Sequence, residues 1–193
     1  MPISMVKTGF QVQLPESVIR LAKEGEIAAF EKIYSTYINA SYNLAYRLTY
    51  NEAVAEDITQ SVYLKVFSSI SNYDFKGSFA GWIRRIVVNE SINQMKSKHQ
   101  LSVVLDNEVA DRESSSLFTA QWLVNAIDLE YYLGKLPKVS RIVIHLHEIE
   151  GYKHKEISGF FNKSESFSKM TLKRAYKELH MLLEIEEKQN AFK

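Results

Sequence analysis

Residues 78–99, SFAGWIRRIVVNESINQMKSKH, carry two patterns on one predicted helix. Apolar residues recur at steps of three and four, which predicts a helix with one buried face. A second stripe at the same spacing is partly basic, with Arg85 and Lys96 on either side of the amide Asn89. A helix that only packs against its neighbours has no need of such a stripe, so this stretch raises the question of a charged partner.

The composition is that of a globular, all-helical protein. The chain has 193 residues, of which 46% are hydrophobic and 24% charged, enough for one domain or two small ones. Only seven Gly and three Pro occur, and the helical period dominates, so we expect an all-α fold without a strand pair. The lack of cysteine excludes a disulfide scaffold, thiolate catalysis and a cysteine-type zinc site.

The sequence also predicts where the protein resides. No apolar run approaches the roughly 18 residues that a membrane-spanning helix requires. The N-terminal residues MPISMVKTGFQVQLPES lack the basic start and apolar centre of a signal peptide. We therefore expect a soluble, cytoplasmic protein that makes no membrane contact of its own.

The first predicted domain covers residues 1–98. It begins with a loose leader and a short helix that ends at Gly25, and a long helix follows. The residues expected to face inward on that long helix are Ile27, Phe30, Ile33, Tyr34, Tyr37 and Ile38. Asn51 is the expected N-cap of a helix over 53–70. A polar turn at 71–78 separates this helix from the one predicted within residues 78–99.

The remainder of the chain is predicted as a linker and a second helical domain. Residues 99–118 lose the periodicity and are acidic, which indicates a flexible linker. The second domain is expected over 119–185, with a tail at 186–193. Its helices are predicted through Trp122, Ile127 and Leu133, then from Pro137 to Gly151, with Val139, Ile142, Val143, Leu146 and Ile149 inward.

A helix-turn-helix closes the second domain. A short helix around 156–161, a tight connection at 162–164 and a long helix from Glu165 form this unit, with Ser164 as the expected N-cap. The residues expected to face inward on the long helix are Leu172, Ala175, Leu179 and Leu182.

Catalysis has little support in the sequence. There is no Gly-rich phosphate loop and no G-x-S-x-G nucleophile motif. His145 and His147 are two residues apart and would point to different faces of a helix, so we interpret all five histidines as surface residues. We expect no enzyme activity, no catalytic residue, no metal and no cofactor.

Basic residues are concentrated on two helices, one in each predicted domain. Four basic residues lie within 84–98 against Glu90 alone, and five lie within 163–177 against Glu165 alone. The second helix has the form of one that enters the major groove of DNA. A solvated basic face on an ordinary helical hairpin explains it equally well, so the segment alone leaves both interpretations open.

Two sets of motifs resemble the extracytoplasmic-function (ECF) group of bacterial RNA polymerase sigma factors. AEDITQSVYLKVF and FKGSFAGWIRRIVVNESINQMKSK resemble region two. The matching residues are Asp57, Ile58, Gln60, Phe79, Trp82, Ile83, Arg85, Ile86 and Asn89. LPKVSRIVIHLHEIEGYKHKEIS and SESFSKMTLKRA resemble region four. The matching residues are Leu136, Pro137, Arg141, Leu146, Glu150, Gly151, Tyr152, Glu156, Ile157, Ser164, Glu165, Lys169, Leu172, Arg174 and Ala175.

The resemblance implies an ECF-type sigma factor that binds core RNA polymerase, directs it to promoters and helps to melt the minus-ten element. The core-binding residues would be Asp57, Gln60, Ser61 and Leu64. The residues at the minus-ten element would be Asp74, Phe75, Lys76, Ser78, Arg84, Arg85, Asn89, Lys96 and Lys98. Those at the minus-thirty-five element would be Ser166, Lys169, Met170, Lys173, Arg174 and Lys177.

The resemblance further implies core RNA polymerase, promoter DNA and an anti-sigma factor as partners. The chain departs from the family pattern at Ser61, and at four positions of the last helix, which are Ser166, Phe167, Ser168 and Thr171.

Asn89 would contact a base or the loop, or would be a buried amide with satisfied hydrogen bonds. Trp82 is interpreted as a core residue. Two other functions stay open, an autonomous helix-turn-helix regulator that binds duplex operator DNA and a helical protein-interaction module.

Overall fold

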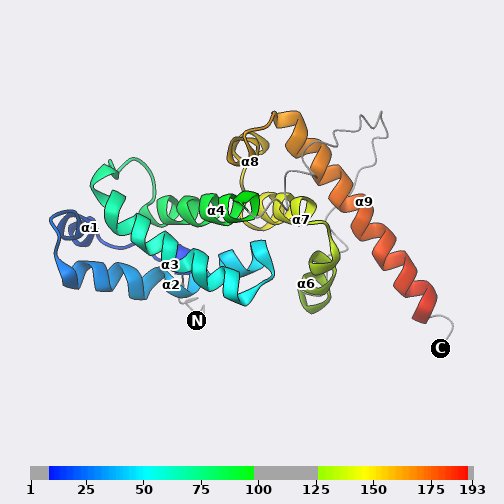
Figure 1. Cartoon of the computed structure of the whole chain (residues 1–193), viewed down its shortest axis with the longest axis horizontal. Helices are drawn as coiled ribbons and strands as arrows, with labels where there is room; N and C mark the ends of the chain where they lie inside the picture. The colour runs from blue at the N-terminus through cyan, green and yellow to red at the C-terminus, as the bar shows by residue number, and fades with distance from the viewer. Residues whose placement is uncertain (1–8, 98–125, 191–193) are drawn as a thin grey trace, which may run out of the picture. The chain divides into compact units, whose positions relative to one another are not determined.

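The computed structural model describes residues 9–97 and 126–190, and in these residues every regular element is a helix (Figure 1). The all-α prediction is confirmed. The chain divides into two compact units, Met1–Met95 and Lys96–Lys193. The predicted linker and the helical residues around Trp122 lie outside the described residues.

The first unit begins with η1 (Gly9–Gln11), α1 (Glu16–Lys23) and the long helix α2 (Ile27–Thr49). It continues with α3 (Glu52–Ser69), η2 (Ile70–Asn72) and α4 (Phe79–Ser97), whose last residues pass into the second unit. Helix α2 packs against both α1 and α3. The two-residue connection between α2 and α3 ends at Asn51, whose side chain accepts a hydrogen bond from the Val54 amide at 2.9 Å, so the predicted N-cap is present.

The core of the first unit confirms two of the six residues predicted to face inward on the long helix, Ile33 and Tyr37, while Phe30 and Ile38 are half-buried. Ile33 and Tyr37 of α2 are completely buried, as are Val62 of α3 and Ile83 of α4. Two predictions on α2 are wrong, because Ile27 is 72% exposed and Tyr34 is 46% exposed.

The physical reason is that the buried stripe of α2 is narrower than the run of apolar residues. It follows steps of four through Ala29, Ile33, Tyr37 and Ser41. Tyr34 lies on the flank of this stripe, where its ring meets Tyr63 edge-on at a centroid distance of 4.8 Å. A residue at this boundary is apolar without being covered.

The second unit contains α6 (Ala126–Lys135), α7 (Lys138–Ile144), η4 (His145–Ile149), α8 (His154–Phe161) and α9 (Glu165–Asn190). Helix α9 packs against α7 and α8 and also contacts α6. It reaches Asn190, so residues 186–190 of the expected tail are helical. The buried residues Ile142, Leu146, Ile157 and Leu179 form the centre of this unit.

Two predictions in the second unit are wrong, and a π-helical turn over η4 accounts for the one at Ile149, whereas His145 belongs to a run, residues 139–146, that is buried on every side. The Glu150 amide donates to the His145 carbonyl at 3.1 Å, a five-residue step that widens the helix and changes the register of its faces. Ile149 is therefore 49% exposed instead of inward. His145, predicted at the surface, is buried with 2% exposure, whereas His180 is exposed.

The helix-turn-helix forms as predicted. Helix α8 ends at Phe161, and the left-handed backbone of the next residue, Asn162 (φ 55°), reverses the chain. The Lys163 amide then donates to the Ser158 carbonyl at 3.0 Å. The Ser164 hydroxyl accepts a hydrogen bond from the Phe167 amide at 3.3 Å, which caps α9.

Candidate polymerase and nucleic-acid interfaces

The four predicted core-binding residues share one exposed face of α3. Asp57, Gln60, Ser61 and Leu64 are all exposed, and their steps of three and four place them along a single line. The opposite side of the helix is buried through Ile58, Val62 and Val66. We call the four exposed residues the α3 face.

The α3 face continues from Leu64 to Phe67, an exposed aromatic residue that the sequence analysis did not include. Leu64 is 71% exposed, and Phe67, one turn later, is 37% exposed. The Phe67 ring packs edge-on against Phe30 of α2 at a centroid distance of 4.8 Å. Exposed large apolar side chains that adjoin one another indicate a binding surface more than isolated ones do. The sequence signal that could have added Phe67 is its place one turn after Leu64 on the same helix.

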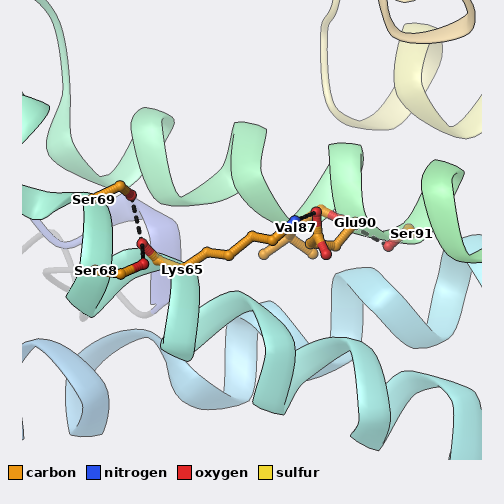
Figure 2. Close-up of polar contacts among 6 residues, drawn as sticks. All are labelled: Lys65, Ser68, Ser69, Val87, Glu90 and Ser91. Carbon is orange, nitrogen blue, oxygen red and sulfur yellow. Dashed lines mark hydrogen bonds and ion pairs between the residues drawn. The ribbon is translucent and has the colours of Figure 1, made fainter.

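An ion pair joins α3 to α4, as Figure 2 shows. Lys65 Nζ lies 2.5 Å from Glu90 Oε1, and the Glu90 side chain is only 14% exposed. Nearby, the Ser91 hydroxyl donates to the Val87 carbonyl at 2.8 Å within α4 (Figure 2). Glu90 is the single acidic residue among the basic residues 84–98, and its carboxylate pairs with a lysine of α3.

The predicted minus-ten residues on α4 differ in exposure. Arg85 is exposed, while Arg84 and Asn89 are half-buried. Lys96 occupies the last turn of the helix, and Lys98 lies outside the described residues. Trp82 stacks on Phe79 at a centroid distance of 5.4 Å and meets Tyr73 at 5.6 Å. Phe79 and Tyr73 are buried but Trp82 is only half-buried, so Trp82 lies at the edge of this ring cluster and not inside the core as predicted.

The other predicted minus-ten residues lie in one loop, residues 73–78, directly before α4. Asp74 accepts a hydrogen bond from the Lys76 amide at 3.0 Å and pairs with the Lys76 ammonium at 3.1 Å. These contacts hold the pKa of the Asp74 carboxyl below its ordinary value, with the hydrogen bond from the Lys76 backbone as the main cause. The Ser78 hydroxyl accepts from the Gly81 amide at 3.3 Å and so caps α4.

The predicted minus-thirty-five residues form an exposed basic face on α9. Ser166, Lys169, Lys173, Arg174 and Lys177 are exposed, and Met170 is half-buried. Lys169 pairs with Glu165 at 2.8 Å, and this contact holds the pKa of the Glu165 carboxyl below its ordinary value.

Two of the departures from the family pattern on α9 point inward. Ser168 is completely buried and Thr171 is 5% exposed. The Ser168 hydroxyl lies 3.0 Å from His154 Nδ1 of α8, and Phe167 packs on Phe161 at a centroid distance of 5.5 Å. Of the four departures only Ser166 is exposed, so it alone stands on the surface that would read DNA.

The histidines do not gather into a metal site. His147 and His154 stack with ring centroids 4.2 Å apart. In residues 9–97 and 126–190, no three histidine or carboxylate side chains lie together as metal ligands would. No helix among these residues is both long enough and apolar enough to span a membrane.

Two family comparisons match the chain in separate segments. Sigma-70 region 2 matches residues 33–100, which include α3, the 73–78 loop and α4. Sigma-70 region 4 matches residues 127–179, which include the helix-turn-helix. Together the two segments cover more than half of the chain.

Named relatives agree with these matches. The ECF RNA polymerase sigma factor SigE of Mycolicibacterium smegmatis is 28% identical over 138 residues, which cover 69% of this chain and 53% of that protein. The ECF RNA polymerase sigma factor SigW of Bacillus subtilis is 32% identical over 101 residues, which cover 52% and 54%. The matched part thus spans about half the length of each of these two relatives.

A solved structure shares the fold. The sigma factor RpoE of Bartonella quintana, solved in complex with the anti-sigma factor NepR, superposes with a TM-score of 0.55 at 21% identity, covering 82% of this chain and 99% of that chain. Region two and region four follow one another here in the order of the family. The chain therefore belongs to the sigma-70 family of RNA polymerase sigma factors and, with its relatives SigE and SigW, to the ECF group.

Proposed function

We propose that this protein binds core RNA polymerase, directs it to specific promoters and helps to melt the minus-ten element. The α3 face carries the proposal. It presents a carboxylate, an amide, a hydroxyl and a leucine to solvent on a helix whose other side is buried. A helix that only packs in its own domain has no use for a 71% exposed leucine beside an exposed aromatic ring.

The minus-ten element would be held by α4 and the 73–78 loop. Arg84, Arg85, Lys96 and Lys98 supply positive charge for phosphates of the separating strands. The loop, through Asp74, Phe75, Lys76 and Ser78, would accept an unstacked base. Asn89, which is half-buried on α4, would contact a base or the backbone of the loop.

The minus-thirty-five element would be read as duplex DNA by α9. Ser166, Lys169, Met170 and Lys173 belong to the first turns of the helix, where base edges of the major groove are reached. Arg174 and Lys177 follow on the same exposed side and would neutralise phosphates. The sequence alone left open whether this basic face binds DNA or is only solvated. In this proposal the face is solvated in the free protein and binds DNA in the complex.

The protein would carry out no covalent chemistry, because the polymerase makes the RNA. Its net charge of +1 fits a factor that engages promoters within holoenzyme, since an isolated strong DNA binder requires a larger positive excess. An anti-sigma factor is a further expected partner, as in the Bartonella quintana complex. With these partners, the protein would act in the cytoplasm.

A pull-down with purified bacterial core RNA polymerase tests the proposal. We expect saturable binding of the full chain, and we expect Asp57→Ala/Gln60→Ala to weaken it by about tenfold through loss of two polar contacts. Glu24→Ala/Glu26→Ala is the matched control, because both glutamates are exposed in the turn between α1 and α2.

Two other outcomes of the binding experiments would favour one of the two alternative functions. A folded chain that does not bind the polymerase but binds duplex DNA alone would show an autonomous helix-turn-helix regulator. A folded chain that binds neither, with no salt-dependent affinity for DNA, would show a helical protein-interaction module.

A further inference from the structure

The N-terminal segment Gly9–Lys23 contacts the 73–78 loop at three places. Lys23 Nζ donates to the Tyr73 carbonyl at 2.7 Å. The Arg20 guanidinium carbon lies 4.6 Å from the centre of the Phe75 ring. The Ser78 hydroxyl donates to Gln13 Oε1 at 3.0 Å. The segment therefore touches the beginning, the middle and the end of the loop.

The loop has a backbone that needs external support. Phe75 has φ 61°, a left-handed conformation that is unfavourable for a bulky side chain, and Gly77 has φ 88°. Inside the loop, the Tyr73 hydroxyl donates to the Gly77 carbonyl at 2.8 Å. The Phe75 ring meets Tyr73 at a centroid distance of 5.1 Å, and Lys23 Nζ lies 5.0 Å from its centre. Two cations of α1 thus lie against the ring of the strained residue.

The N-terminal segment is itself fixed to the core of the first unit. The Tyr37 hydroxyl of α2 donates to the Val12 carbonyl at 2.9 Å, and the Tyr37 ring stacks with Phe10 at 6.1 Å. Ile19 and Ala22 of α1 are buried, and α1 packs on α2. The segment thus connects the loop to a completely buried residue of the core.

We propose that Gln13, Arg20 and Lys23 are positioning residues for recognition of the minus-ten element. They hold the 73–78 loop in the shape that accepts a base, without touching the base themselves. This inference rests on the proposed function, since it concerns how the same loop selects a sequence. It gives a role to the leader before Gly25, to which neither the motifs nor the periodicity assigned one.

A positioning role and a phosphate contact predict different measurements. Removing a cation that touches a phosphate of the single-stranded segment weakens binding to all sequences alike and lowers the salt slope by about 0.7. Removing a residue that shapes the loop changes which bases are preferred and leaves the salt slope unchanged. The two can therefore be separated with one set of variants.

The experiment uses the full chain assembled with bacterial core RNA polymerase. The probe is a pool of fork-junction DNA with a randomised single-stranded minus-ten segment, sequenced before and after recovery with the holoenzyme. The variants are Lys23→Met, Arg20→Met and Gln13→Ala. Lys32→Met is the matched control, because Lys32 is exposed on α2 and its side chain has no part in the loop contacts.

We expect each of the three variants to lose about five- to tenfold of the preference at one or two adjacent positions of the minus-ten segment. The salt slope and polymerase binding should match those of the wild type and of Lys32→Met. Arg20→Lys, which keeps a cation over the ring, should retain the wild-type profile. Thermal unfolding followed by circular dichroism identifies folded variants. If Lys23→Met fails to fold, the comparison of Arg20→Met with Arg20→Lys tests the inference.

Two results would overturn the inference. One is an unchanged base profile in folded Arg20→Met and Gln13→Ala, and the other is uniform weakening with a lower salt slope. A wild-type holoenzyme that binds the polymerase but enriches no minus-ten sequence would instead refute the proposed function, and the role of these three residues with it.

Discussion

Replacing Leu64 by alanine should weaken binding to core RNA polymerase by roughly tenfold without unfolding the protein. Complete burial of a leucine side chain is worth about 1.5–3 kcal/mol relative to its exposure. Leu64 is 71% exposed in the free chain, so about 1–2 kcal/mol of that gain is still available to a partner. This corresponds to about five- to thirtyfold in the dissociation constant.

The same exposure predicts that stability changes little. Leu64→Ala removes few contacts in the free protein, so the free energy of unfolding should stay within about 0.5 kcal/mol of the wild type. Binding is measured by titrating fluorescently labelled protein with core polymerase, and unfolding by urea. Leu21→Ala of α1 is the control, because Leu21 is also an exposed leucine of the first unit, at 47%, but lies outside the α3 face.

Either of two results would refute this reasoning. If Leu64→Ala binds the polymerase as tightly as the wild type, the leucine stays solvated in the complex and the α3 face acts through its polar groups alone. If Leu64→Ala and Leu21→Ala weaken binding equally, the loss is not specific to the α3 face. A change confined to Leu64→Ala supports apolar burial at this position.

Three further predictions concern caps, charge and pH. Asn51→Ala should lower the free energy of unfolding by about 1 kcal/mol in urea titrations, since the Val54 amide loses its acceptor, and an unaltered midpoint would contradict the cap. Lys173→Ala should reduce the salt slope of promoter binding by about 0.9 if the lysine neutralises a phosphate, whereas an unchanged slope excludes that contact. Burial, reinforced by His147 and Lys169, lowers the pKa of His154 below 6.5, so the unfolded chain takes up a proton that the folded chain does not. Stability of the second unit should therefore fall as the pH drops below about 6.5, and His154→Asn should flatten that dependence in thermal unfolding at a series of pH values.

The features that the sequence predicted well depend on neighbouring residues. The Asn51 and Ser164 caps each satisfy an amide three residues later, so the pattern that predicts them is contained in one turn. The helix-turn-helix follows the same logic, because Asn162 tolerates the left-handed backbone that the connection requires. The exposed α3 face, which the resemblance implied, agrees with the helical period, since Ile58 and Val62 on the other side of the helix are buried.

The wrong predictions arise where the helix departs from its regular period, or where the run of apolar residues is wider than the face that is buried. Ile149 was assigned to the wrong environment because a π-helical turn changes the register, and no residue type in HLHEI announces that turn. His145 was assigned to the surface although residues 139–146 are buried on every side, where periodicity cannot identify an exposed face. Tyr34 was assigned to the core because it is aromatic and adjacent to Ile33. Periodicity locates the centre of a buried stripe, but the neighbouring helices decide its width.

The 73–78 loop shows why a site can be located from sequence and still not be explained by it. Its position before α4 and its resemblance to the family were visible in the residues themselves, but the residues that support it are far away in the chain. Lys23 and Tyr73 are 50 positions apart, and Gln13 and Ser78 are 65 apart. Such contacts depend on how α1 packs on α2, which no local pattern encodes. If the loop selects the base, the base preference of this sigma factor is set partly by residues that belong to none of its recognition motifs.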